Sequence, residues 1–347
     1  MESEHRRVQN RTEWKVAMGW ILLEGVLFGG CASMSQDPDV VLVREPGNRT
    51  YNSPVPVMEM AKSQWEYAVL SENVYFAPLK GRVADTGEPT TEVRKYQTAA
   101  PEEYARSCTP DSVDPLPLPG WTRWSGFPSR ELWQEAREVG LFVEVWEKAS
   151  SPPVVAVVFR GTEFTSVEDW ISNLRWFLRF VPFYPDQYTV VAQRVGEEVI
   201  HRLAQRADRQ ELRLVTTGHS LGGGLAQHLA YSLPIGGPRV SHVYAFDPSP
   251  VTGWSAVGHE LRRANAEGLE IDRVFEHGEI LAYVRLLLSY VNPPSAADPA
   301  IREIRYNFIE SVNPLKRHSI RFLACALIKA SGQVPLPDLR ERFRGRE

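Results

Sequence analysis

The segment Gly218-His219-Ser220-Leu221-Gly222 constrains the fold of this chain more than any other part of its sequence. A β-type run, 212–217, precedes the segment, and a helical pattern, 221–232, follows it. A serine between a strand and a helix, with a glycine two residues away on each side, is typical of a sharp turn that exposes the serine hydroxyl. The helix N-terminus then directs free N–H groups and partial positive charge toward that hydroxyl.

Strand and helix patterns alternate along the chain from residue 140. Such alternation predicts a mostly parallel sheet with helices on both of its faces, an α/β fold. We expect strands over 141–146, 154–159, 212–217, 240–246, 271–275 and 304–308, and helices over 130–139, 188–205, 221–232 and 280–289.

The length of 347 residues fits a single α/β domain with insertions. We expect this domain to cover 58–330, to begin with a helix over 58–75, and to contain an irregular cap or insertion over 77–128, where Pro, Gly and charged residues are frequent. The polar, Pro-dotted stretch 32–57 is interpreted as a linker, and 331–347 as a flexible tail.

The N-terminal residues 1–31 resemble a bacterial lipoprotein signal. Basic residues precede the apolar run 16–30, which is too short to span a bilayer as a mature helix, and small residues stand directly before Cys31. Lipidation of Cys31 would anchor the protein to the bacterial cell envelope without spanning the membrane. A cleaved, soluble exported protein and an uncleaved cytosolic protein are the alternatives.

The net charge of −4 argues against a nucleic-acid partner. The sequence contains no Cys/His cluster with zinc spacing, no phosphate-binding glycine loop and no EF-hand loop, so we expect no cofactor. Besides Cys31, the chain has Cys108 and Cys325, for which a disulfide and two separate buried thiols are both open. The oligomeric state is not predicted.

Three motifs together resemble the class 3 (fungal-type) lipase family. They are GHSLGG around Ser220, Phe159-Arg160-Gly161-Thr162 upstream of it, and the segment DWISNL at 169–174. The resemblance covers roughly 140–325 and implies an α/β-hydrolase fold with Ser220 as nucleophile. It also implies an oxyanion hole formed by the backbone N–H groups of Thr162 and Leu221.

A serine nucleophile needs a general base, for which histidine has a suitable pKa. Of the eight histidines, His318 alone follows the last predicted strand and precedes a terminal helix. Because the partners in this fold follow the serine in the order acid and then histidine, we predict that His318 is the base.

Two residues compete for the role of the acid that orients the base. Asp247 follows the strand 240–246, and Glu279 follows the next strand, 271–275. The position of Glu279 matches the acid of class 3 lipases, although that family uses Asp, whereas the Asp-Pro setting of Asp247 resembles the pancreatic-type lipases. Both remain open at this point.

Aromatic residues gather at 170–184, where the resembling family has a lid that opens on lipid surfaces; core packing is the alternative interpretation. The expected activity is hydrolysis of lipid-like carboxylesters, small-molecule substrates met at a membrane surface, through an acyl-enzyme. The alternatives are a phospholipase or thioesterase of the same fold and a lipid-anchored envelope protein without enzymatic activity.

Overall fold

The computed structural model describes residues 37–51, 53–76, 100–110, 112, 114–161, 186–282, 285, 295, 298–309 and 313–336. By its internal contacts the chain divides into Met1–Asp37 and Pro38–Glu347. All the elements below belong to the second unit.

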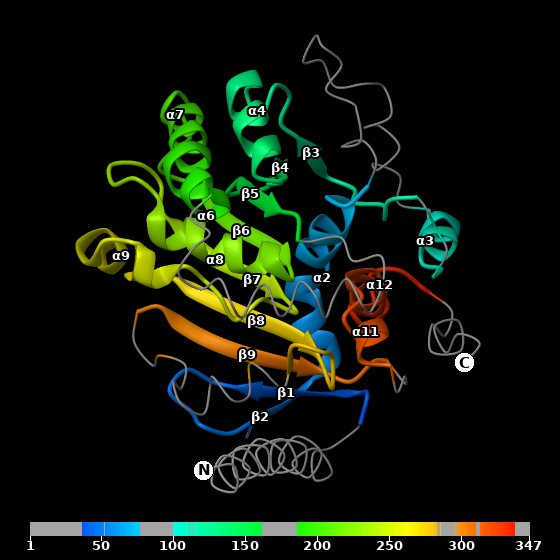
Figure 1. The fold of residues 1–347 in the computed structure, drawn as a ribbon. Coiled ribbons are helices and arrows are strands. Elements are labelled where there is room, and N and C mark those ends of the chain that lie inside the picture. Colours follow the sequence, from blue (N-terminus) through cyan, green and yellow to red (C-terminus); the bar gives the residue numbers. More distant parts are fainter. Residues whose placement is uncertain are drawn as a thin grey trace, which may run out of the picture. The chain divides into compact units, whose positions relative to one another are not determined.

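A nine-stranded sheet forms the centre of this unit, in the order β2-β1-β9-β8-β7-β6-β5-β4-β3 (Figure 1). The five strands from β5 to β9 run parallel, and the strands at both ends are antiparallel to their neighbours. The strands are β1 (Val40–Arg44), β2 (Ser53–Pro56), β3 (Trp121–Arg123), β4 (Val143–Lys148), β5 (Val154–Phe159), β6 (Arg213–His219), β7 (Val240–Phe246), β8 (Glu270–Glu276) and β9 (Ala300–Tyr306).

Helices cover both faces of the sheet. The helical elements are α2 (Val57–Asn73), α3 (Pro101–Ser107), α4 (Arg130–Glu138), α6 (Asp186–Val190), the π-helical turn η3 (Val191–Val195), α7 (Gly196–Ala204), α8 (Leu221–Ser232), the 3₁₀ turn η4 (Trp254–Ala256), α9 (His259–Ala266), α11 (Pro314–Arg317) and α12 (Ile320–Ala330). The predicted fold class, a mostly parallel sheet between helices, is confirmed.

The domain has two hydrophobic cores, one on each face of the sheet, and the strand β5 contributes to both. All six of its residues are buried, because alternate side chains point to opposite faces of a sheet that is covered on both sides. Val154, Ala156 and Val158 pack with α2 and α12, whereas Val155, Val157 and Phe159 pack with η3, α7 and α8. An uninterrupted β-branched run is the expected sequence pattern for such a strand.

The predicted N-terminal linker was wrong. The stretch interpreted as a linker, 32–57, contains β1 and β2, which extend the sheet by antiparallel pairing with β9. Val41 and Val43 on β1 are buried, so this hairpin contributes to the core. Prolines suggested a tether, but Pro54 and Pro56 lie on the outermost strand, β2, where a missing N–H costs no internal sheet hydrogen bond.

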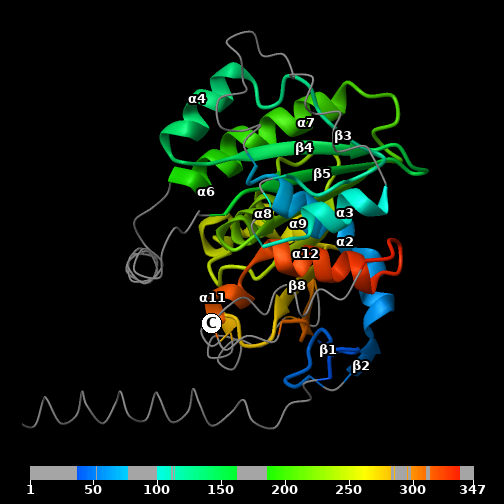
Figure 2. The same ribbon diagram turned by 90° about the vertical axis from the view of Figure 1, so that its right-hand side faces the viewer.

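The cap region is fastened to the domain by a disulfide and a buried ion pair. Cys108, at the end of α3, is bonded to Cys325 of α12, which decides between the two alternatives left by the sequence. Arg321 of α12 pairs with Glu72 of α2 at 2.8 Å and also donates hydrogen bonds to two carbonyl groups of the cap. Figure 2 shows α2, α3 and α12 together on one face of the sheet.

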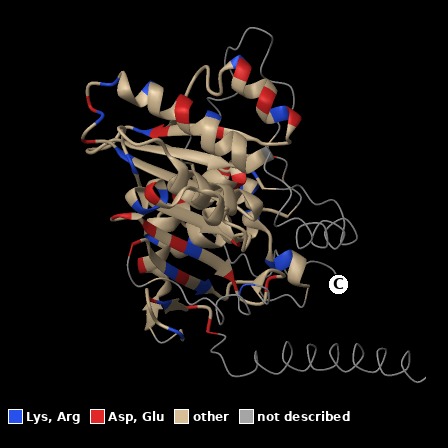
Figure 3. Ribbon diagram, turned by 60° about the vertical axis from the view of Figure 1, so that its left-hand side comes forward, with Lys and Arg blue, Asp and Glu red and all other residues tan. Residues whose placement is uncertain are grey.

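Basic and acidic positions are intermixed along the elements in Figure 3, in keeping with the nearly balanced charge. Among the described residues, none of the helices is long and apolar enough to cross a membrane. The folded part also continues beyond the predicted boundary at 330, because Val334 and Leu336 are buried in the core next to α12.

Candidate active site

Ser220 occupies a strained turn between β6 and α8. Its φ of 55° and ψ of −121° lie in a region that non-glycine residues rarely adopt. Glycine is needed on both sides, because a Cβ atom on Gly218 would lie 2.5 Å from the backbone of Gly222, and one on Gly222 would overlap the backbone of Phe159. The motif therefore forms the tight turn that the sequence predicts, but the side chain of Ser220 is buried rather than exposed.

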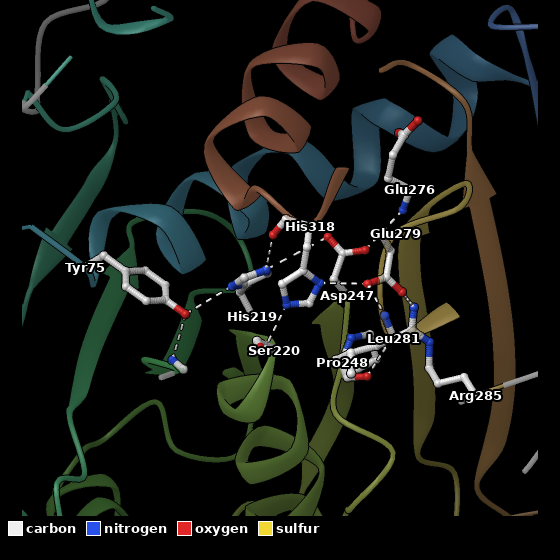
Figure 4. Close-up of polar contacts among 11 residues, drawn as sticks. Tyr75, His219, Ser220, Asp247, Pro248, Glu276, Glu279, Leu281, Arg285 and His318 are labelled. Carbon is white, nitrogen blue, oxygen red and sulfur yellow. Dashed lines mark hydrogen bonds and ion pairs between the residues drawn. The ribbon is translucent and has the colours of Figure 1, made fainter. Parts of the chain in front are cut away.

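The structure places His318 beside this serine. His318 lies between α11 and α12, and its Nε2 atom is 3.1 Å from the Oγ atom of Ser220 (Figure 4). Both side chains are buried. This is hydrogen-bond distance, so Nε2 is positioned to accept the serine proton.

Glu279 completes the chain of hydrogen bonds. Nδ1 of His318 donates to Oε2 of Glu279 at 2.7 Å, and the backbone N–H of Leu281 donates to the same oxygen at 2.8 Å. The other carboxylate oxygen binds the guanidinium group of Arg285, which also donates to the carbonyl oxygen of Pro248 at 2.7 Å. Arg285 thus fixes the orientation of the acid that orients the base.

Electrostatics keep Glu279 ionised. Burial by itself would raise the pKa of Glu279, but the charge of Arg285 and the hydrogen bond with His318 outweigh burial and lower the pKa below its ordinary value. A carboxylate in this position fixes the tautomer of His318 and stabilises the imidazolium that forms during proton transfer.

Asp247, the other candidate acid, points elsewhere. Its Oδ1 accepts the backbone N–H of Glu276 at 3.1 Å, while Oδ2 lies 3.9 Å from Nε2 of His219 and has no hydrogen-bond partner among the described residues. Burial and the nearby charge of Glu279 raise the pKa of Asp247 well above its ordinary value. Asp247 is therefore suited to remain protonated beside an ionised Glu279.

Of the two predicted oxyanion donors, only Leu221 is among the described residues. Leu221 is the first residue of α8, where helix N–H groups lack intrahelical acceptors. Thr162 lies outside the described residues, but Gly161 directly before it is described. A Cβ atom on Gly161 would lie 3.2 Å from the Cβ of Ser220, so the backbone leading to Thr162 passes against the nucleophile.

Two residues of this site carry no signal in the sequence. Tyr75 lies just beyond α2, and its hydroxyl contacts both Gly161 and His219. Arg285 falls within a predicted helix, where a single arginine carries no motif. The predicted lipid anchor Cys31 and the aromatic segment 170–184 lie outside the described residues.

One cluster has ligand atoms close enough for a metal ion. These atoms of His219, Asp247 and His318 lie within 4.8 Å of one another. All four ring nitrogens of the two histidines, however, already face protein hydrogen-bond partners. The described residues of this cluster therefore fit a hydrogen-bonded network better than a metal site.

Comparison with known proteins finds a family match to a phospholipase-like domain, described as the Tle-like phospholipase domain, over residues 66–234. The match covers just under half of the chain and includes Tyr75 and Ser220, but it ends before Glu279 and His318. Proteins with curated descriptions give no significant match.

Among solved structures, the chain is similar to a Rhizomucor miehei lipase propeptide complex, a deletion mutant, with 16% identity and a TM-score of 0.40. That alignment covers 73% of this chain and 64% of the other, so the chain spans slightly less than two thirds of that protein. A fungal lipase–inhibitor complex gives 16% identity, a TM-score of 0.40, and coverage of 70% and 77%. The mostly parallel sheet between helices, with Ser220 on a tight turn from β6 into α8, is an α/β fold, and residues 66–234 are similar to a phospholipase-like domain.

Proposed function

We propose that this protein is a serine hydrolase that cleaves carboxylesters of lipid-like substrates through an acyl-enzyme. The observation that carries the proposal is the continuous hydrogen-bonded chain from Ser220 Oγ through His318 to Glu279. Such a chain activates an otherwise weakly nucleophilic hydroxyl at neutral pH.

The proposed reaction proceeds in two halves. Nε2 of His318 takes the proton from Ser220 as Oγ attacks the ester carbonyl carbon, and the N–H groups of Leu221 and Thr162 stabilise the oxyanion. The tetrahedral intermediate collapses, and His318 returns the proton to the departing alcohol. A water molecule, deprotonated by His318, then attacks the acyl-enzyme, releasing the fatty acid and regenerating Ser220.

Phospholipid carboxylesters are the substrate class that we favour among lipid esters. The support is the match of residues 66–234 to a phospholipase-like domain, which raises this alternative above triacylglycerols and thioesters. Fatty-acid release from phosphatidylcholine vesicles, from an emulsified triacylglycerol and from an acyl thioester would rank the three substrates. Faster turnover of either of the other two than of the phospholipid would contradict this choice.

A fluorophosphonate probe tests the serine mechanism directly. The wild-type protein should be labelled covalently, and Ser220→Ala should not, with ester turnover lost in parallel. Ser249→Ala is a matched control, because Ser249 is also buried and lies close to the site without contacting His318. An unlabelled wild-type protein would favour a binding protein without enzymatic activity.

We infer further that the protein is anchored at the bacterial cell envelope through a lipid on Cys31, with segment 170–184 contacting the lipid surface. Expression in bacteria with an alkyne-tagged fatty acid should label the wild-type protein but not Cys31→Ser. Removing the apolar residues of 175–184 should impair turnover of vesicles and emulsions more than that of soluble short esters; equal losses would contradict the lid.

A further inference from the structure

The hydroxyl group of Tyr75 joins two segments that both adjoin Ser220. It accepts a hydrogen bond from the backbone N–H of Gly161 at 2.9 Å and lies 3.0 Å from Nδ1 of His219 (Figure 4). Gly161 precedes Thr162 in the loop that follows β5, and His219 directly precedes the nucleophile. Tyr75 itself lies beyond α2, far from both segments in sequence.

His219 continues this connection to the general base. Its Nε2 lies 3.0 Å from the backbone carbonyl oxygen of His318, and the two imidazole rings are 4.7 Å apart. A continuous line of hydrogen bonds therefore runs from Gly161 through Tyr75 and His219 to the backbone of His318. It is separate from the line that links Ser220, the His318 ring and Glu279.

If both imidazole rings are neutral, only one placement of the protons makes every contact along this line a hydrogen bond. The carbonyl of His318 can only accept, so Nε2 of His219 carries the proton and Nδ1 is an acceptor. Tyr75 then accepts from Gly161 and donates to Nδ1 of His219. Burial, and next the charge of His318, lower the pKa of His219 well below its ordinary value, which favours this neutral form.

Neutrality of His219 matters for the base. His318 becomes an imidazolium during proton transfer, and a second positive ring 4.7 Å away would oppose that step. Among the described residues, His219 contacts Tyr75, His318 and, at 3.9 Å, the Asp247 carboxyl group, while the charge of Arg285 also lowers the pKa of His219. A protonated Asp247 adds no charge there.

We propose that Tyr75 and His219 are positioning residues that hold the backbone at Gly161, directly before the predicted oxyanion donor Thr162, and the backbone of His318 in register beside Ser220. The inference rests on the proposed hydrolase function and deepens it. One set of hydrogen bonds, from Gly161 through Tyr75 and His219 to the backbone of His318, would align both the oxyanion loop and the general base. Neither residue contacts the reacting atoms.

Tyr75→Phe tests the unit by removing only the hydroxyl group. We expect kcat for a soluble ester to fall by about 10- to 100-fold with KM within a factor of about two, since misplaced catalytic groups affect the reaction more than substrate binding. Tyr306→Phe is the control, because its hydroxyl likewise makes a hydrogen bond inside the protein, donating to Gln64 at 2.8 Å, away from Ser220. Its kcat should stay close to that of the wild type.

Two replacements of His219 test its two hydrogen bonds one at a time. His219→Asn keeps an acceptor near the Nδ1 position for Tyr75 but loses the donor to His318, whereas His219→Gln keeps a donor near Nε2 and loses the acceptor. In either background, adding Tyr75→Phe should cost less in kcat than it costs in the wild type, because the connection is already broken. Unfolding midpoints of all variants provide the check for loss of fold.

The outcomes are distinguishable. Wild-type protein that neither turns over esters nor reacts with the fluorophosphonate would overturn the hydrolase function and this inference together. If the wild type is active, two results would overturn the inference alone. One is a Tyr75→Phe variant as active as the wild type; the other is a double variant whose loss of kcat equals the product of the losses of the two single variants. A rise in KM with unchanged kcat would equally overturn it, because it would place Tyr75 in substrate binding.

Discussion

Glu279 accepts a hydrogen bond from Nδ1 of His318 at 2.7 Å, although each residue comes from a different loop at the carboxyl end of the sheet. The competing carboxyl group of Asp247 is equally buried but hydrogen-bonds to the backbone of Glu276. Burial and the charge of Glu279 raise the pKa of Asp247, whereas Arg285 and His318 lower that of Glu279, so the two neighbouring acids have opposite pKa shifts.

Substitution of the two acids should therefore have unequal effects. Glu279→Gln removes the charge that stabilises the His318 imidazolium, so kcat should fall by roughly 1,000- to 10,000-fold. Asp247→Asn replaces a protonated carboxyl group with a neutral amide of similar shape, and asparagine tolerates the positive φ of 40° at this position. Its kcat should stay close to the wild-type value; a larger loss for Asp247→Asn than for Glu279→Gln would reverse the assignment.

Arg285 should control the pH range of activity through Glu279. Since the charge of Arg285 lowers the pKa of Glu279, Arg285→Met should raise that pKa. Glu279 would then be protonated at higher pH, so the ratio of mutant to wild-type kcat/KM should fall as the pH is lowered from 8 to 5. Arg273→Met, which loses a hydrogen bond to Gln227 instead, serves as the control, and a ratio independent of pH in Arg285→Met would contradict the role.

Gly222 should not tolerate a side chain. A Cβ atom there would overlap the backbone at the end of β5, so Gly222→Ala should lower the free energy of unfolding by about 1–3 kcal/mol and slow fluorophosphonate labelling of Ser220. Gly258→Ala is the matched control, because a Cβ atom at Gly258 meets no atom within 4 Å and its φ is −52°. Denaturant unfolding of both variants measures the difference, and equal stabilities would contradict the close approach.

Glu276 should make the protein less stable as the pH rises. Burial raises its pKa to about 7, above the value of an unfolded glutamate, so its contribution to stability is fully present below about pH 4.5 and lost as the pH rises through about 7. Relative to the wild type, Glu276→Gln should therefore be more stable at pH 8 than at pH 5, with a difference on the order of 3 kcal/mol. Thermal unfolding across this range is the measurement, and a pH-independent difference would exclude Glu276 as the group that titrates.

The disulfide between Cys108 and Cys325 should contribute to stability because it joins residues separated by 217 positions. Replacing both cysteines with alanine should lower the free energy of unfolding by about 2–5 kcal/mol. Dithiothreitol should lower the unfolding midpoint of the wild type and leave that of the double variant unchanged. A wild-type midpoint that does not respond to complete reduction would show that the bond adds nothing to stability.

Much of the fold followed from patterns that are local in sequence. Alternating strand and helix signals predicted the mostly parallel sheet, and the glycines around Ser220 predicted the turn, because both depend on residues close along the chain. The position of His318 next to Ser220 also agrees with an expectation based on chain order. The linker over 32–57 was wrong, since pairing of β1 with β9 joins residues that local sequence does not relate.

The sequence by itself determined the fold class, the turn of Ser220 and the choice of His318. Only the tertiary structure shows that Glu279, and not Asp247, hydrogen-bonds to the His318 ring, and that Tyr75 and Arg285 lie in the site. The reason is physical: Asp247 and Glu279 end neighbouring parallel strands at the same edge, and the sequence does not say which carboxyl group turns toward His318. That direction is set by the positive φ of Asp247, the N–H of Glu276 that its carboxyl group accepts, and the Arg285 pairing of Glu279.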